Sequence, residues 1–160
     1  MSFFAGAFIA AQESGVELTL SDDVLRANSG ARIWRAPKQG ILAHHQSLIT
    51  PEDRWERLPM VLAGGRKALV FDGRLDNRAD LIRSLGLRAG GKSLPDGALV
   101  AAAIERWEDD ACRRLLGDFA YACWDVVNRR LVLACDPIGG RAILYHSNRD
   151  RIVFATTVEA

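Results

Sequence analysis

The stretch GDFAYACWDVVNRRLVLACDP, residues 117–137, decides the fold class of this chain. Its two apolar runs are rich in strand-forming residues, and they flank the polar turn Asn128-Arg129-Arg130, which is the pattern of an antiparallel hairpin. A second hairpin follows, with strands over residues 142–147 and 151–157 joined by Asn148-Arg149-Asp150. We therefore expect the last third of the chain to form antiparallel sheet.

Upstream of residue 117 the pattern is helical. Asn77 is expected to cap a helix over residues 78–85 that ends at Gly86, and Asp96 to cap a helix over 97–107. Further strands are expected over residues 3–10, 31–37, 40–45 and 67–73, with short helical segments over 22–28 and 109–116. Strands, then helices, then strands indicate one α+β domain with helices layered on antiparallel sheets.

Composition excludes several classes of function. The 160 residues include 21 basic and 20 acidic side chains, a net charge of +1, which gives no footprint for nucleic acid or an anionic membrane. No apolar run approaches the roughly 18 residues of a spanning helix, and the apolar start lacks the basic region of a signal peptide. We expect a cytoplasmic protein with no nucleic-acid or membrane partner.

The cysteines and histidines give no signal for a metal site. Cys112, Cys123 and Cys135 are odd in number and form no CxxC pair, so we expect reduced core thiols and no disulfide. His44 and His45 are adjacent on a predicted strand and therefore point to opposite faces. No metal and no cofactor is expected in this domain.

Several stretches in a fixed order resemble the amino-terminal, class II glutamine amidotransferase domain of asparagine synthetases. They are LVFDGRLDNRADLIRSL at 69–85, LPDGALVAAAIERWEDDACRRLLGDFAYACWD at 94–125, LVLACDPIGGRAILYH at 131–146 and RIVFATTVEA at 151–160. The resemblance implies a four-layer α/β/β/α sandwich of the N-terminal-nucleophile hydrolase type, with two mainly antiparallel sheets face to face. It also implies that residues 1–160 are the front of a longer chain whose ATP-using synthetase domain follows.

In the family the initiator Met is removed, and an amino-terminal cysteine becomes the nucleophile with its own α-amine as base. MSFFAG at residues 1–6 is similar to the family's Met-Cys-Gly-Ile-Ala-Gly start, so Ser2 falls at the nucleophile position. A hydroxyl is a poorer nucleophile than a thiolate. Phe3 replaces the usual Gly and adds bulk beside the reacting atom.

The resemblance also locates a glutamine pocket, and most of its positions have changed. Gln46, with His45 as a neighbouring alternative, stands where an Arg would bind the α-carboxylate, and a neutral amide cannot form that ion pair. The family's Asn-Gly-Glu triplet, which supplies an oxyanion donor and a partner for the α-ammonium, is here Asp72-Gly73-Arg74. Gly73 keeps a backbone N–H, and Asp96 is retained. We expect these changes to abolish useful glutamine hydrolysis.

The leading hypothesis is a glutaminase-inactive amidotransferase-like domain in an ATP-dependent amide-bond-forming enzyme. β-Lactam synthetases and lasso-peptide macrolactam synthetases keep this fold without needing ammonia, and the lasso-peptide branch is slightly favoured. ATP and Mg would then bind in the synthetase domain, for which this domain acts as a scaffold. Other partners would be a peptide or small-molecule substrate and a second copy in a homodimer.

Two alternatives stay open. In the first, Ser2 is an active nucleophile of an amidotransferase or hydrolase, as in glutamine-hydrolysing asparagine synthetase, with Arg74 binding an anionic substrate. In the second, the chain is a stand-alone binding module.

Overall fold

The computed structural model describes residues 2–9, 30–48, 51–87 and 94–157. The strands are β1 (Phe3–Ile9), β2 (Arg32–Ala36), β3 (Gly40–His45), β4 (Met60–Leu62), β5 (Lys67–Leu75), β6 (Gly117–Asp125), β7 (Arg130–Cys135), β8 (Leu144–Ser147) and β9 (Arg151–Ala155). The helices are α2 (Arg78–Ser84) and α3 (Asp96–Trp107), and the 3₁₀ turns are η1 (Pro51–Trp55), η2 (Ala63–Gly65) and η3 (Glu108–Arg114).

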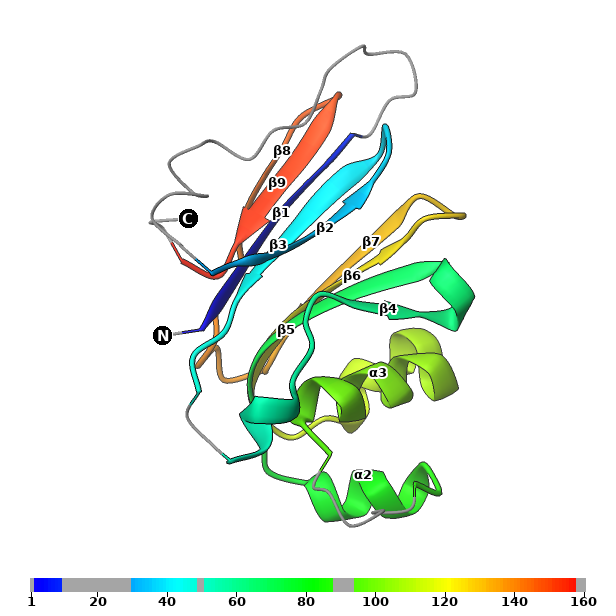
Figure 1. The fold of residues 1–160 in the computed structure, drawn as a ribbon, viewed down its shortest axis with the longest axis vertical. Coiled ribbons are helices and arrows are strands. Elements are labelled where there is room, and N and C mark those ends of the chain that lie inside the picture. The colour runs from blue at the N-terminus through cyan, green and yellow to red at the C-terminus, as the bar shows by residue number, and fades with distance from the viewer. Residues whose placement is uncertain (1, 10–29, 49–50, 88–93, 158–160) are drawn as a thin grey trace.

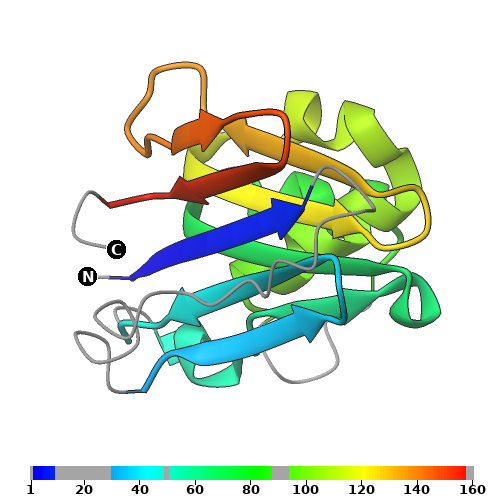
Figure 2. The same cartoon turned by 90° about the horizontal axis from the view of Figure 1, so that it is seen from above.

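The strands form two sheets, in the orders β2-β3-β1-β9-β8 and β4-β5-β6-β7, and every pairing is antiparallel. The sheets lie face to face, and α2 and α3 cover the outer face of the β4–β7 sheet (Figure 1). Seen from above, β1 runs through the middle of its sheet, with β3 on one side and β9 on the other (Figure 2). The predicted α+β sandwich of two antiparallel sheets is confirmed.

Side chains along β5 alternate between the two faces of its sheet, so this strand contributes to two separate hydrophobic cores. Ala68 and Val70 face the other sheet, where they join Phe4 and Phe8 of β1 in one buried cluster. Leu69 and neighbouring odd-numbered residues of β5 face α3 in the second cluster. The central strand β1 is buried on both faces from Phe4 to Ile9, which is why its sequence reads as a continuous apolar run.

Several predicted element boundaries are wrong. β5 does not stop at Gly73 but continues to Leu75, because Gly73 adopts a φ of +135° and stays paired with Phe119. Asp96 is the first residue of α3 rather than its cap, which is Pro95. The segment predicted as a helical turn over 109–116 is the 3₁₀ turn η3. The helix expected over residues 22–28 lies outside the described residues.

The prediction for the cysteines is only partly confirmed. All three are free thiols; Cys123 is buried, but Cys112 is half-buried and Cys135 is exposed. Cys135 ends β7, whose residues are half-buried at best, so its apolar neighbours do not place it in a core.

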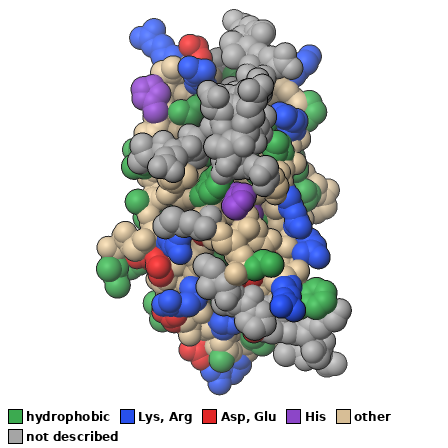
Figure 3. All heavy atoms as spheres, turned by 60° about the vertical axis from the view of Figure 1, so that its left-hand side comes forward, with side chains coloured by type: hydrophobic (Ala, Val, Ile, Leu, Met, Phe, Trp, Pro, Cys, Tyr) green, Lys and Arg blue, Asp and Glu red, His purple; other side chains and the backbone are tan. Residues whose placement is uncertain are grey.

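On the face drawn in Figure 3, the described residues form no single charged region. Lys and Arg side chains are scattered over the face drawn in Figure 3, with acidic side chains among them. No described helix combines the length and the apolar character needed to cross a bilayer.

Candidate functional site

All six residues that the sequence placed at the site line one cavity of about 160 Å³ at the start of β1. Ser2 lies just before β1, and Gln46 follows β3. Asp72, Gly73 and Arg74 lie near the end of β5, and Asp96 begins α3. The lining residues are Ser2, His44, Gln46, Ser47, Asp53, Glu56, Leu58, Phe71, Asp72, Gly73, Arg74, Asp96, Asp118 and Arg141. The spatial grouping predicted from the sequence is therefore present.

The hydroxyl of Ser2 is committed to a carboxylate. Its Oγ donates a hydrogen bond of 2.7 Å to Oδ1 of Asp72, 70 residues away in the chain. Asp72 is only 3% exposed, and burial raises the pKa of its carboxyl group, against the hydrogen bond from Ser2 and the charge of Arg141. The position where the family has an oxyanion donor thus holds an acceptor.

Arg141 supplies the cation that balances this carboxylate. Its Nη1 donates to Asp72 Oδ2 at 2.9 Å, and its Nε lies 3.7 Å from Asp118 Oδ2. The side chain comes from a turn held by Asp136, whose carboxylate accepts the backbone N–H groups of residues 138–141. Asp118 also lies against Gly140, where an added Cβ would be 2.4 Å from Oδ1.

The two side chains expected at the glutamine head group, Gln46 and Arg74, are bonded to other parts of the chain. The amide of Gln46 donates to the backbone carbonyl of Asp53. Arg74 turns toward solvent, with its side chain 65% exposed and its Nε 2.8 Å from Asp76 Oδ1. Neither side chain presents an uncommitted charge to the cavity.

The carboxylate of Asp96 is also bonded within the fold. Its Oδ2 accepts the backbone N–H of Leu75 at 2.8 Å, and its carboxylate forms an ion pair with Arg78 of α2. Asp96 therefore ties the end of β5 to the starts of α2 and α3, a role that the cap assignment missed.

Glu56 is a site residue that the sequence did not indicate. It is 6% exposed, accepts the backbone N–H of Gly97 at 2.9 Å, and leaves no room for a side chain there, since a Cβ on Gly97 would lie 2.7 Å from Oε1. Burial raises the pKa of the Glu56 carboxyl group. The one sign of this contact in the sequence was a glycine directly after Asp96, at the start of a helix.

His44 and Phe3 complete the surroundings of Ser2. Burial lowers the pKa of His44 to about 4, so its imidazole is neutral at pH 7. The ring of Phe3 stacks on His45 with centroids 5.3 Å apart, so the bulk expected beside the nucleophile packs on β3.

The charge balance of the cavity decides what it can bind. Its described lining carries five carboxyl groups, those of Asp53, Glu56, Asp72, Asp96 and Asp118, against two guanidinium groups, those of Arg74 and Arg141. Both guanidinium groups are paired with aspartates. A free carboxylate entering this space meets no uncommitted cation among the described residues that line it. Nor do those residues contain a group of three His, Cys, Asp or Glu side chains placed to hold a metal ion.

A sandwich of two antiparallel sheets, with Ser2 lining a polar cavity, fits the N-terminal-nucleophile hydrolase type of fold. Residues 45–160 match the family model described as a glutamine amidotransferase domain. The chain belongs to this family.

Curated relatives place it among asparagine-synthetase-like proteins. Over 79 residues, 48% of this chain, it is 37% identical to a protein of Mycobacterium tuberculosis named putative asparagine synthetase [glutamine-hydrolyzing]. Over 140 residues, 84% of the chain, it is 25% identical to asparagine synthetase [glutamine-hydrolyzing] 3 of Bacillus subtilis. These matches cover only 12% and 22% of the relatives' own lengths. The chain is thus an asparagine-synthetase-like glutamine amidotransferase domain.

Proposed function

We propose that this domain does not hydrolyse glutamine and serves as a scaffold for an ATP-dependent, amide-bond-forming synthetase domain. The observation that carries the proposal is the closed Ser2–Asp72–Arg141 network, in which the nucleophile, the oxyanion position and the half-buried Arg141 guanidinium satisfy one another. An amide-forming enzyme whose substrate brings its own amine needs no ammonia. β-Lactam synthetases and lasso-peptide macrolactam synthetases use such substrates, and we favour the lasso-peptide type.

Electrostatics supports this reading at two points of the reaction. The tetrahedral intermediate puts negative charge on an oxygen, and loss of one donor to that oxygen typically lowers the rate by about 10²–10³. Here the donor is replaced by Asp72, whose ionised form repels the developing charge. Binding of the α-carboxylate loses a further charge-assisted pair, worth roughly 2–5 kcal/mol where it is buried.

The same proposal also implies where the cofactors bind, which partners the domain has and where the protein is located. ATP and Mg would bind in the synthetase domain rather than here, and the partners would be that domain and its peptide or small-molecule substrate. We place the protein in the cytoplasm.

The hydrogen bond between Ser2 and Asp72 favours a second candidate function. A carboxylate 2.7 Å from a serine hydroxyl is placed to accept its proton, so Asp72 could activate Ser2 in a hydrolase with another substrate. Treatment with a glutamine-analogue electrophile and a serine-directed electrophile, followed by mass spectrometry, separates the two functions. The scaffold predicts no adduct on Ser2. An adduct that is lost in Ser2→Ala would establish the hydrolase.

A stronger nucleophile should not rescue glutamine hydrolysis. In Ser2→Cys the thiol replaces the hydroxyl, but Gln46, Asp72 and Arg74 are unchanged. We expect ammonia release from glutamine to stay at the level of Ser2→Ala, measured by a coupled ammonia assay after removal of Met1 has been verified by mass. Substantial release by Ser2→Cys would contradict the pocket assignments at these three positions.

A further inference from the structure

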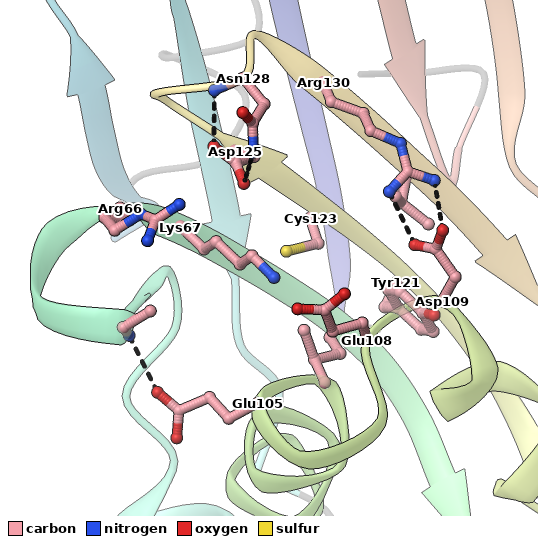
Figure 4. A pocket seen from close by; sticks show the side chains of 13 residues that line it. Arg66, Lys67, Glu105, Glu108, Asp109, Tyr121, Cys123, Asp125, Asn128 and Arg130 are labelled. Carbon is pink, nitrogen blue, oxygen red and sulfur yellow. Dashed lines mark hydrogen bonds and ion pairs between the residues drawn. The ribbon is translucent and has the colours of Figure 1, made fainter.

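A second and larger cavity, of about 320 Å³, lies on the helix side of the β4–β7 sheet (Figure 4). Its volume falls at the lower end of the roughly 300–1,000 Å³ typical of small-molecule sites. It is lined by Ala63, Arg66, Lys67, Ile104, Glu105, Glu108, Asp109, Tyr121, Cys123, Asp125, Asn128, Arg130 and Val132.

This cavity is distinct from the one at Ser2. Lys67 and Asp72 both belong to β5, but they point to opposite faces of the sheet, since side chains alternate along a strand. At about 3.3 Å per residue, the two positions are roughly 17 Å apart along the strand. No residue lines both cavities.

Most charged groups around the second cavity are used by the fold. Asp109 and Arg130 form a bidentate pair at 2.7 and 2.8 Å, which closes one wall between η3 and β7. Asp125 accepts the N–H groups of Val127 and Asn128 in the hairpin turn. Glu105 accepts the backbone N–H of Ala63 at 2.9 Å.

Charges of both signs remain, carried by Arg66, Lys67 and Glu108. Among the described residues, Lys67 Nζ and the Glu108 carboxylate form no hydrogen bond or ion pair with a side chain, and both point into the cavity in Figure 4. Glu108 also has a φ of +50° and a ψ of −119°, a conformation that is strained for a residue with a Cβ. Its backbone N–H is fixed by Ile104 O at the end of α3.

The floor between these charges is apolar. It consists of Ile104, Tyr121, Cys123 and Val132. Burial raises the pKa of the Cys123 thiol to about 11, so the thiol is neutral at pH 7. Burial also raises the pKa of Tyr121, which keeps its phenol protonated.

We propose that this cavity binds a small apolar α-amino acid as its zwitterion. Its carboxylate pairs with Lys67, its ammonium group pairs with Glu108, and its side chain packs on the floor of Ile104, Tyr121, Cys123 and Val132. A ligand with both charges pairs with Lys67 and Glu108 at once, whereas an anion or a cation alone leaves one of these two groups unpaired.

Leucine and two analogues test the proposal, with amide-resolved NMR titration of the 160-residue chain as the measurement. Isoamylamine is leucine without its carboxylate, and 4-methylpentanoate is leucine without its ammonium group. We expect leucine to give saturable shifts at Lys67, Glu108 and Cys123, and each analogue to bind at least about tenfold more weakly, which is about 1.4 kcal/mol. Lys67→Met and Glu108→Gln should each weaken leucine binding by a similar factor.

Controls separate this site from the first. Arg106→Met removes an exposed cation of α3 that does not line the cavity, and Ser2→Ala changes the other cavity; both should leave leucine binding unchanged. The proposal is overturned by an absence of saturable shifts, by shifts that persist in Lys67→Met and Glu108→Gln, or by 4-methylpentanoate binding as tightly as leucine. Failure of these tests would leave the proposal for Ser2 unaffected, since no residue is shared.

Discussion

Replacement of Arg141 by methionine is expected to lower the free energy of unfolding by about 3 kcal/mol near pH 8. The Arg141 side chain is 23% exposed, and the Asp72 side chain that it neutralises is 2% exposed. Without Arg141, the Asp72 carboxylate is a buried charge with Ser2 as its remaining hydrogen-bond donor and Asp118 as a repulsive neighbour. Methionine keeps most of the apolar length of the side chain, so the loss isolates the charge.

The size of this loss should depend on pH. Burial raises the pKa of Asp72 above its unfolded value, so ionisation of the carboxyl group lowers stability as the pH rises through the folded pKa. Removal of Arg141 takes away a charge that opposes this shift, so the folded pKa rises further. The destabilisation is therefore expected to be greatest at about pH 8 and clearly smaller at about pH 4, where the raised pKa leaves more of the carboxyl group protonated.

Urea unfolding at both pH values measures this effect. The matched control is Arg141→Met combined with Asp72→Asn, which replaces the charge by a neutral amide of the same shape and should recover most of the loss at high pH. An equal loss at both pH values, or no recovery in the double variant, would show that the Arg141 side chain stabilises the domain through packing rather than through Asp72.

Gly73→Ala is expected to have a similarly large effect, at least about 3 kcal/mol. A Cβ at this position would lie 2.2 Å from the carbonyl oxygen of Asp118 and 2.6 Å from the Cα of Phe119, and both are backbone atoms of β6 that cannot rotate away. The φ of +135° adds strain for any residue with a side chain. β5 and β6 would have to separate beside Asp72.

Gly86→Ala is the control for this variant. Gly86 also has a positive φ, of +65°, but a Cβ there meets nothing within 4 Å. We expect it to lose only the roughly 1–2 kcal/mol of a left-handed residue. Thermal and urea unfolding of the two variants side by side give the comparison; equal losses would mean that the contact with β6 contributes nothing.

The sequence predicted the site where the signal was local or carried by the family resemblance. Ser2 was located by the similarity of MSFFAG to the family's start, and Asp72, Gly73 and Arg74 by their match to the family's Asn-Gly-Glu triplet. Gln46 followed from the resemblance of ILAHHQSLIT, residues 41–50, to the family segment that carries the carboxylate-binding Arg. These residues do line one cavity.

The parts that could not be predicted depend on contacts between residues far apart in the chain. Arg141 reaches Asp72 across 69 positions, and Glu56 reaches Gly97 across 41. No pattern in one segment signals a partner in another. Asp96 was misassigned for a related reason: a carboxylate at a helix start predicts a local cap, but here it accepts the N–H of Leu75 from another element.

The most direct test of the central claim is an amide-resolved NMR titration of the chain, after removal of Met1, with free glutamine. The claim is that the described residues lining the cavity at Ser2 present no uncommitted cation for the α-carboxylate of glutamine. We predict no saturable shift of the Asp72, Gly73 or Gly97 amides up to about 10 mM glutamine, a limit near 3 kcal/mol of binding free energy. Saturable shifts at these amides with a dissociation constant below about 1 mM, weakened by Asp96→Asn, would contradict the account.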